Sequence, residues 1–231
     1  KIGSTNELAH QRRMRILSAV EARDSISTSE LAQQFNVSII TIMRDLQELE
    51  EKGMILRIHG GATAVRGGGY EKPYLTRENL ALDEKRRIAV AAAEMIEDGD
   101  SIILDVGTTI YELARLLKAR TRLTVIVTTI RLAQALSTQP GIELIVIGGK
   151  YRASEFSMVG HIAEKDLRNF YVDKAFIGAA GIDREIGISE YNVEQAGVRK
   201  VIIEQARQRI ILSDHTKFGI IQLATVCPLS A

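Results

Sequence analysis

From residue 101 onward, short apolar runs alternate with amphipathic stretches, and this alternation restricts the fold more than any other feature of the chain. The runs at 101–104, 123–127, 143–147, 174–178 and 209–212 predict buried strands. The stretches at 109–118, 130–136, 160–167 and 193–206 predict helices between them. A βαβα order requires crossover connections, so we expect a mostly parallel α/β sheet.

The segment before this domain has a different pattern, with three short helices and a hairpin. Ile16, Leu17 and Val20 share one face of a helix expected over residues 9–23. The hydroxyl residues before Glu30 form an N-cap signature for a second helix over 30–35. The pattern therefore predicts a small helical domain.

A third helix is expected over residues 38–52, where Ile42, Leu46 and Leu49 repeat at helical spacing until Gly53 ends it. Residues 54–58 alternate like a strand, and the turn at 59–61 can return the chain as a wing. Two helices joined by a tight turn, with the second one longer, indicate a helix-turn-helix that binds the DNA major groove.

Between the two regions, residues 67–82 contain a run of three glycines and Pro73, a composition typical of a linker. We therefore predict a winged helix-turn-helix domain at 1–66, a linker at 67–82 and an α/β effector domain at 83–231, in which Asp83 caps a first helix running to about Glu97. The chain stops at Ala231, soon after the last expected strand, so we expect a terminal element to be missing.

Charge and composition exclude several classes of protein. The chain has 30 Lys and Arg against 29 Asp and Glu, so any DNA contact must be local. Its single cysteine, Cys227, excludes an intramolecular disulfide framework and is interpreted as a small apolar filler. Without a run of about 20 apolar residues, the chain is expected to be cytoplasmic and to have no membrane partner.

The polar face of the third helix carries the DNA-binding hypothesis. Opposite its apolar stripe lies Arg44, flanked by Ile40, Thr41 and Gln47. Arginine can pair with guanine, glutamine can read adenine, and an apolar group can contact a thymine methyl. The alternative is an ordinary solvated helix face. In the same way, Arg12, Arg13 and Arg15 could contact phosphates or simply be solvated.

This segment resembles the DeoR family of bacterial transcription regulators. The resemblance rests on residues 37–38, 41–42, 44–46, 49–50 and 53, together with the run Arg57-Ile58-His59-Gly60-Gly61-Ala62. Ile39 and Met43 depart from it, since the family usually has glutamate and arginine there. The expected DNA-binding residues are Ser38, Ile40, Thr41, Met43, Arg44, Gln47, Arg57 and His59.

In the second domain, a loop of small residues at 105–109 follows the first strand and leads into a helix. Free backbone N–H groups, the positive helix end and the hydroxyls of Thr108 and Thr109 can bind a phosphate, and Gly107 permits close approach to the main chain. The alternative is that the loop only caps the helix. It matches neither a Walker motif nor a dinucleotide fingerprint.

Further loops follow the later strands, at 128–129, 148–150, 178–183 and 213–217. The carboxyl ends of parallel strands meet at one edge, where ligands of open α/β sheets bind. Taken singly, Lys217 is better explained as a solvated lysine and the glycine pairs as turns. Their joint placement is what favours a site.

These loops also resemble the effector domain of the DeoR family, whose fold is similar to that of ribose-5-phosphate isomerase. The resemblance implies a sugar-phosphate sensor. It places Asp105, Thr108, Thr109 and Lys217 at the effector pocket, with Thr128 and Asp183 lining it. The complete expected effector set is Asp105, Gly107, Thr108, Thr109, Thr128, Gly148, Gly149, Asp183 and Lys217.

Three functions compete for this sequence. The leading one is a repressor of sugar-utilisation genes, with operator DNA and a phosphorylated sugar as partners and without catalytic residues or cofactors. It is expected to be a dimer or tetramer. The alternative is a sugar-phosphate isomerase, but residues 178–183 offer one acid, Asp183, where a base beside the phosphate loop is also needed. A metal-dependent hydrolase is weaker, because the four histidines show no ligand spacing.

Overall fold

We describe a computed structural model that covers residues 2–23, 25–51, 54–64, 71, 73–117 and 121–231, with the side chains of residues 2–8 and 21 left aside. The chain divides into two compact units, Lys1–Lys72 and Pro73–Ala231, which we call the first and the second unit. Each is described by itself.

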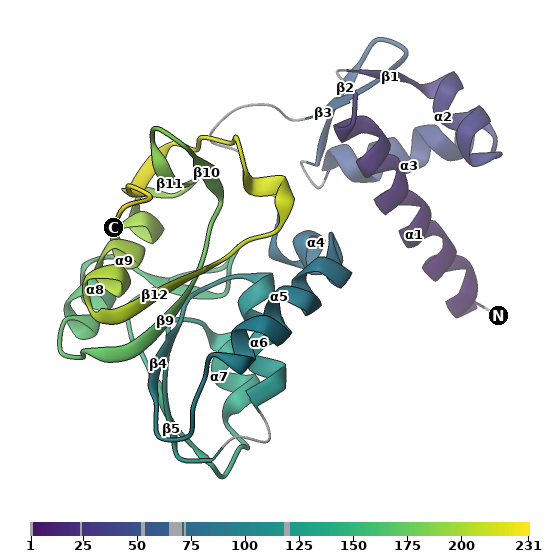
Figure 1. Ribbon diagram of the computed structural model, residues 1–231. Helices are drawn as coiled ribbons and strands as arrows, with labels where there is room; N and C mark the ends of the chain where they lie inside the picture. The colour runs from purple at the N-terminus through teal and green to yellow at the C-terminus, as the bar shows by residue number, and fades with distance from the viewer. Residues whose placement is uncertain (1, 24, 52–53, 65–70, 72, 118–120) are drawn as a thin grey trace. The chain divides into compact units, whose positions relative to one another are not determined.

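The first unit is a three-helix bundle with a small antiparallel sheet, as Figure 1 shows. Its elements are α1 (Ile2–Glu21), β1 (Ile26–Ser27), α2 (Thr28–Phe35), α3 (Ile39–Glu51), β2 (Ile55–Ile58) and β3 (Gly61–Ala64). The strands pair in the order β1-β3-β2, and β2 with β3 forms the predicted wing. Ile16 and Leu17 of α1 are fully buried against Ile42 and Leu46 of α3, so the predicted apolar stripes form the core.

Local capping explains where the short second helix begins and ends. The Ser27 hydroxyl accepts from the Glu30 backbone N–H, and the Glu30 carboxylate accepts from the Ser27 backbone N–H, which forms a capping box. Asn36 takes a left-handed conformation and ends the helix. The Ser38 hydroxyl then accepts from the Thr41 backbone N–H at the start of α3. The predicted helix-turn-helix is thereby confirmed.

The second unit is built on a five-stranded parallel sheet of order β12-β9-β4-β5-β6. Its strands are β4 (Ser101–Leu104), β5 (Leu123–Val127), β6 (Ile142–Val146), β9 (Val172–Gly178) and β12 (Ala206–Leu212). Its helices are α4 (Tyr74–Glu78), α5 (Leu82–Glu94), α6 (Thr108–Leu116), α7 (Ile130–Leu136), α8 (His161–Leu167) and α9 (Val193–Glu204). The predicted parallel α/β class is confirmed.

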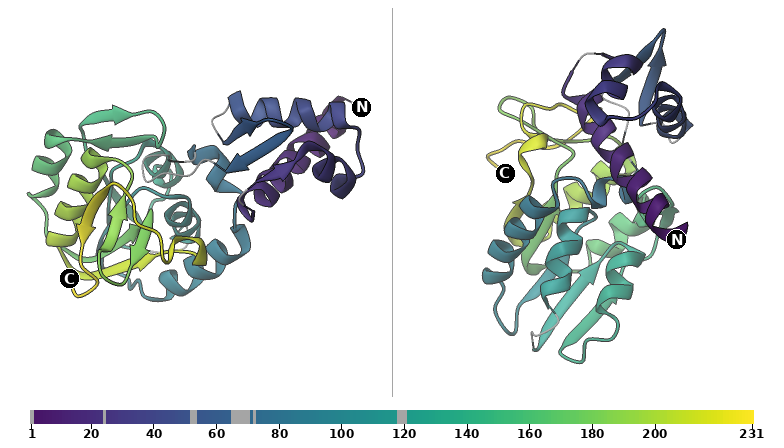
Figure 2. Two further views of the ribbon diagram at one scale, coloured as in Figure 1. Left: turned by 90° about the horizontal axis from the view of Figure 1, so that it is seen from above. Right: turned by 90° about the vertical axis from the view of Figure 1, so that its right-hand side faces the viewer.

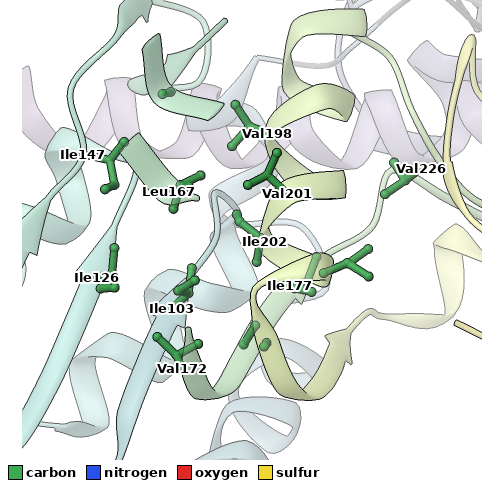
Figure 3. Packing of buried hydrophobic residues seen from close by; sticks show 14 of the residues in the cluster. Ile103, Ile126, Ile147, Leu167, Val172, Ile177, Val198, Val201, Ile202 and Val226 are labelled. Carbon is green, nitrogen blue, oxygen red and sulfur yellow. The ribbon is translucent and has the colours of Figure 1, made fainter. Parts of the chain in front are cut away.

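Helices cover both faces of this sheet, as Figures 1 and 2 show. Apolar side chains of α5, α6 and α7 pack against one face. Those of α8 and α9 pack against the other, where Val198, Val201 and Ile202 of α9 belong to one cluster with Ile103 of β4 and Ile126 of β5 (Figure 3). Successive residues of a strand face opposite sides, which is why Ile102 and Ile103 belong to different cores.

Several elements of the second unit lie outside the predicted pattern. A hairpin, β7 (Lys150–Arg152) with β8 (Ser157–Val159), follows β6. A separate antiparallel sheet consists of β10 (Gly181–Asp183), β11 (Gly187–Glu190) and β13 (Ala224–Cys227). A short 3-10 helix, η2, spans His215–Lys217. These segments are too short to carry a clear hydrophobic period.

The start of the second unit also differs from the sequence analysis. Helix α4 lies within the segment predicted as linker. The predicted cap of α5 at Asp83 is wrong, because the helix begins at Leu82 after a left-handed Ala81 and Asp83 belongs to its first turn. The predicted helix end at 52–53 and the glycine run at 67–69 lie outside the described residues. The domain limits at 66 and 82 stay predictions.

Candidate functional sites

The exposed face of α3 combines apolar side chains with two polar ones. Ile39, Ile40 and Met43 are exposed, with Ile40 at 66%. Arg44 and Gln47 are exposed on the same helix. The Gln47 amide donates to Glu51 Oε1 at 3.0 Å, which holds it along the helix axis. The residues predicted to contact bases, Ile40, Arg44 and Gln47, are therefore accessible to DNA. The exposed face that they share has more apolar than basic side chains.

The opposite face of α3 contains a buried acid that sequence analysis did not single out. Asp45 accepts from Arg12 Nε at 2.6 Å and from Arg12 Nη2 at 3.2 Å. Arg13 pairs with Glu48 at 2.5 Å. Arg12 and Arg13 thus connect α1 to α3, so their interpretation as solvated or phosphate-binding residues misses this contact. Arg15 stacks on the Phe35 ring at 5.3 Å from its centroid.

The wing and the start of α3 contain the other predicted DNA-binding residues. The Arg57 backbone N–H donates to Glu50 Oε1 at 3.3 Å. The Nε of the Arg57 side chain is buried and has no hydrogen-bond partner among the described residues. His59 is exposed in the turn between β2 and β3. The Ser38 and Thr41 hydroxyls lie 2.9 Å apart.

In the second unit, the predicted phosphate loop lies between β4 and α6. Gly107 has a φ of 154°, a value that favours glycine, and directly precedes the helix. Thr108 and Thr109 are buried in its first turn. The first N–H groups of a helix have no partner within it, so this turn can donate to an anion.

Asp105, the first residue of the loop, is bound through one carboxylate oxygen, while its Oδ1 is buried without a hydrogen-bond partner among the described residues. Its Oδ2 accepts from Arg199 Nε at 2.6 Å and from the Gly178 backbone N–H at 3.1 Å. Arg199 of α9 also pairs with Glu190 of β11. Burial raises the pKa of Asp105, and Arg199 opposes this increase. Arg199 and Glu190 were not predicted, because the contact between Arg199 and Asp105 joins residues 94 positions apart and Glu190 reaches the site only through Arg199.

A buried lysine, Lys85 of α5, is a second functional candidate that sequence analysis missed. Its Nζ donates to the Arg77 carbonyl oxygen. Its pKa is lowered to about 8, first by burial and then by the positive charges of Arg77 and Lys217, while Asp214 and Glu112 raise it. Lys217, predicted at the pocket, thus lies close enough to act on Lys85. A helix position within a run of charged residues gave no signal of burial.

Thr128 and the glycine pair follow the ends of β5 and β6. Thr128 is fully buried, and its backbone carbonyl accepts from the Met158 N–H at 2.7 Å. Gly149 has a φ of 146°, and a Cβ there would lie 3.1 Å from the Ala163 Cβ, so this position needs glycine where the chain passes α8. Gly148 precedes it after the buried Ile147.

Asp183, predicted to line the pocket, stabilises a turn in the small sheet. Its Oδ1 accepts from the backbone N–H groups of Glu185 and Ile186 at 2.9 and 3.0 Å. These bonds hold the pKa of Asp183 below its usual value. The segment after η2 runs beside this strand, with the Gly219 N–H donating to the Ile182 carbonyl at 2.8 Å. The chain segments of Asp183 and Lys217 therefore lie side by side.

No group of three or more His, Cys, Asp or Glu within the described ranges is arranged to hold a metal ion. Likewise, none of the described helices is long and apolar enough to cross a membrane. His215 pairs with Glu84 at 2.7 Å, which raises the His215 pKa.

A winged helix-turn-helix is followed by a parallel α/β unit, and open sheets of this kind bind ligands at the carboxyl ends of their strands. This combination defines a class of DNA-binding regulators that carry a ligand-sensing domain. Residues 12–66 match the family "DeoR-like helix-turn-helix domain", and residues 80–231 match "DeoR C terminal sensor domain". The chain belongs to the DeoR family of transcriptional regulators, which confirms the predicted family and class. The family consists of regulators and not enzymes, so the isomerase alternative is not favoured.

Two transcriptional repressors agree with this assignment. The chain is 32% identical over 209 residues to the glycerol-3-phosphate regulon repressor of Escherichia coli, covering 90% of this chain and 82% of that protein. It is 37% identical over 209 residues to the HTH-type transcriptional repressor GlcR of Bacillus subtilis, covering 90% and 80%. Ribose 5-phosphate isomerase A from Methanocaldococcus jannaschii aligns at 21% identity and a TM-score of 0.44, covering 59% and 54%.

Proposed function

We propose that this regulator represses genes of sugar utilisation, that it binds operator DNA through α3 and the wing, and that a phosphorylated sugar at the carboxyl edge of the sheet controls this binding. A dimer or tetramer in the cytoplasm would let two copies of α3 read two half-sites. Two of its relatives are named as repressors, one of them of a glycerol-3-phosphate regulon.

The observation that carries the effector proposal is the group of cations around Lys85. Lys85 is 3% exposed, and two further positive charges, Arg77 and Lys217, lower its pKa. Asp214, which influences Lys85 more than either cation, opposes this change, and Arg77 is itself paired with Glu155. An anion beside Lys85 and Lys217 would further favour the charged form of Lys85. Glu112, which also acts on Lys85, lies one helical turn after Thr108. Lys85 therefore lies beside the first turns of α6.

A phosphate can contact both the first turn of α6 and the side chains of Lys85 and Lys217. The first turn of α6 offers backbone donors and the hydroxyls of Thr108 and Thr109, and Lys85 and Lys217 offer counter-charge. The resulting control of DNA binding requires that the two DNA-binding states differ in their affinity for the effector. A coupling of about 5- to 150-fold would be typical.

The test uses operator fragments selected from random DNA with the full chain and followed by fluorescence anisotropy. Phosphorylated sugars are expected to change operator affinity, whereas the matching free sugars are not. Thr108→Val and Lys217→Ala are expected to lose this response and to keep operator binding in the absence of ligand. A response to unphosphorylated sugars alone would contradict the proposal, and turnover of ribose 5-phosphate would revive the isomerase alternative.

The DNA-binding half of the proposal rests on Arg44. If its guanidinium pairs with a guanine, Arg44→Ala should cost about 1–3 kcal/mol of operator binding and relax the preference at one base pair. Anisotropy titrations with operators that differ at single positions measure both effects. Equal affinity of a folded Arg44→Ala protein for the parent operator would show that Arg44 does not read DNA.

A further inference from the structure

A group of polar side chains lies beneath α9, on the side of the sheet opposite Lys85, and we call Thr128, Ser157 and Gln195 the polar layer. Leu104 of β4 and Val127 of β5 are register partners, so the next residues, Asp105 and Thr128, are neighbours that face the same side. That side is the α8 and α9 face, because Ile103 and Ile126 two positions earlier lie in its core (Figure 3).

Helix α9 supplies the other wall. Gln195, Arg199 and Ile202 are spaced at one helical turn or nearly so and share a face. Ile202 packs into the core, Arg199 reaches Asp105, and Gln195 Oε1 accepts from Ser157 Oγ at 3.0 Å. Ser157 forms an isolated antiparallel β-bridge with Thr129, the residue that follows Thr128. The Gln195 amide is therefore held beside the carboxyl end of β5.

Two polar atoms of this layer are buried without a hydrogen-bond partner among the described residues. They are Thr128 Oγ1 and Gln195 Nε2, on side chains whose residues are 0% and 1% exposed. An unpaired buried donor costs free energy, so such groups are almost always paired in folded proteins. One amide donor and one hydroxyl that can donate or accept suit a carbonyl or hydroxyl oxygen.

We infer that Thr128 and Gln195 bind the sugar portion of the effector at the end away from the phosphate, and that Gln195 determines specificity. This inference rests on the proposed function and narrows its ligand to a phosphate ester with a hydroxyl or carbonyl oxygen that reaches the polar layer. A ligand without that oxygen leaves the amide donor unpaired and binds more weakly. The amide also has no lone pair basic enough to take a proton from carbon, which agrees with binding rather than isomerisation.

The experiment compares affinities of the full chain by isothermal titration calorimetry. The ligands are inorganic phosphate, glycerol 3-phosphate, ribose 5-phosphate, glucose 6-phosphate and fructose 6-phosphate. Gln195→Glu keeps the shape of the side chain and an acceptor for Ser157, but it replaces the Nε2 donor with an oxygen. Gln195→Met removes the donor without adding charge. Gln134→Met changes an exposed glutamine of α7 and is the matched control.

Both Gln195 variants should weaken the tightest sugar phosphate by about tenfold or more, the change that one lost hydrogen bond supplies, and leave the Kd of inorganic phosphate unchanged. Thr108→Val should weaken both ligands, and Gln134→Met neither. Parent-like binding of the sugar phosphate by both Gln195 variants would overturn the inference alone. An equal loss of affinity for the sugar phosphate and for inorganic phosphate would also overturn the inference, because it would show that the substitutions disturb the fold in general. If the parent binds none of the five ligands, the proposed function falls and the inference with it.

Discussion

Each unit of the chain buries an aspartate against an arginine, and the two contacts differ in surroundings. In the first unit, Asp45 and Arg12 join two helices, and 24% of the Arg12 side chain stays exposed. In the second unit, Asp105 and Arg199 lie at the strand ends, where the Asp105 side chain is 0% exposed and a second acid, Glu190, shares the arginine. The first contact supports helix packing. The second brings two buried acids to one arginine at the carboxyl edge of the sheet, the edge at which we propose that the effector binds.

The largest expected effect comes from removing the shared arginine. Arg199→Met leaves Asp105 and Glu190 buried without their counter-charge, which should lower the free energy of unfolding by about 3–5 kcal/mol. Chemical denaturation followed by circular dichroism measures the change. A variant as stable as the parent would mean that both acids are neutral, and the comparison between the two units would fail.

Replacing the buried lysine should have the opposite sign. Its folded pKa of about 8 lies below the ordinary 10.5, so the charged form is disfavoured in the fold. The fold is therefore more stable at high pH, where the lysine is neutral, and this stability is lost as pH falls from 10.5 through about 8. At pH 7 the fold bears the full penalty of holding the charged lysine. Lys85→Met, which also gives up the bond to the Arg77 carbonyl, should raise stability by about 2 kcal/mol at pH 7.

The gain from Lys85→Met should shrink as pH rises from about 8 and should vanish above 10.5, where the lysine becomes neutral in the unfolded chain as well. Denaturation midpoints at pH 7 and pH 10 test this. A gain that is the same at both pH values would point to packing and not to charge.

The partly exposed pair of the first unit should matter less. Arg12→Met should cost about 1 kcal/mol, since water screens the pair and Arg13 lies 3.9 Å from the same carboxylate. A double-mutant cycle with Asp45→Asn gives the coupling energy. A loss as large as that of Arg199→Met would remove the distinction drawn between the two contacts.

The smallest effect concerns the DNA face. Met43→Arg restores the residue usual in the family and should add one phosphate contact, which steepens the log–log dependence of operator affinity on salt by about 0.9. Met43 is 46% exposed, so the new side chain needs no repacking. Anisotropy titrations at several salt concentrations give the slope. An unchanged slope would show that position 43 points away from the phosphates.

The sequence predicts what repeats at short range. Helical and strand periods place the main sheet strands and the three helices of the first unit, and the capping residues around Ser27 mark a helix start. Contacts such as Arg199 with Asp105 join residues 94 positions apart and leave no local pattern. Helix α4 shows a different limit, because five residues after Pro73 are too few to show a period.

The same contrast applies to the candidate sites. The exposed face of α3 follows from its helical period, and the loop at 105–109 follows from its place after a strand. Lys85 and Gln195 look like surface residues of their helices, and only the packing of α5 and α9 on the sheet buries them. Which of the predicted site residues bind DNA or effector stays a prediction that the proposed variants address.

The three exposed apolar side chains at the start of α3 would affect how operator binding responds to temperature if this helix contacts DNA as proposed. Ile39, Ile40 and Met43 lose water if they contact thymine methyl groups. Burial of apolar surface gives association a negative heat-capacity change. The stabilisation that this burial provides weakens on cooling. A recognition helix that carried charge at positions 39 and 43 would depend more on salt and less on temperature. If α3 reads the operator as proposed, operator binding would depend less on salt and more on temperature than with charged residues at these positions.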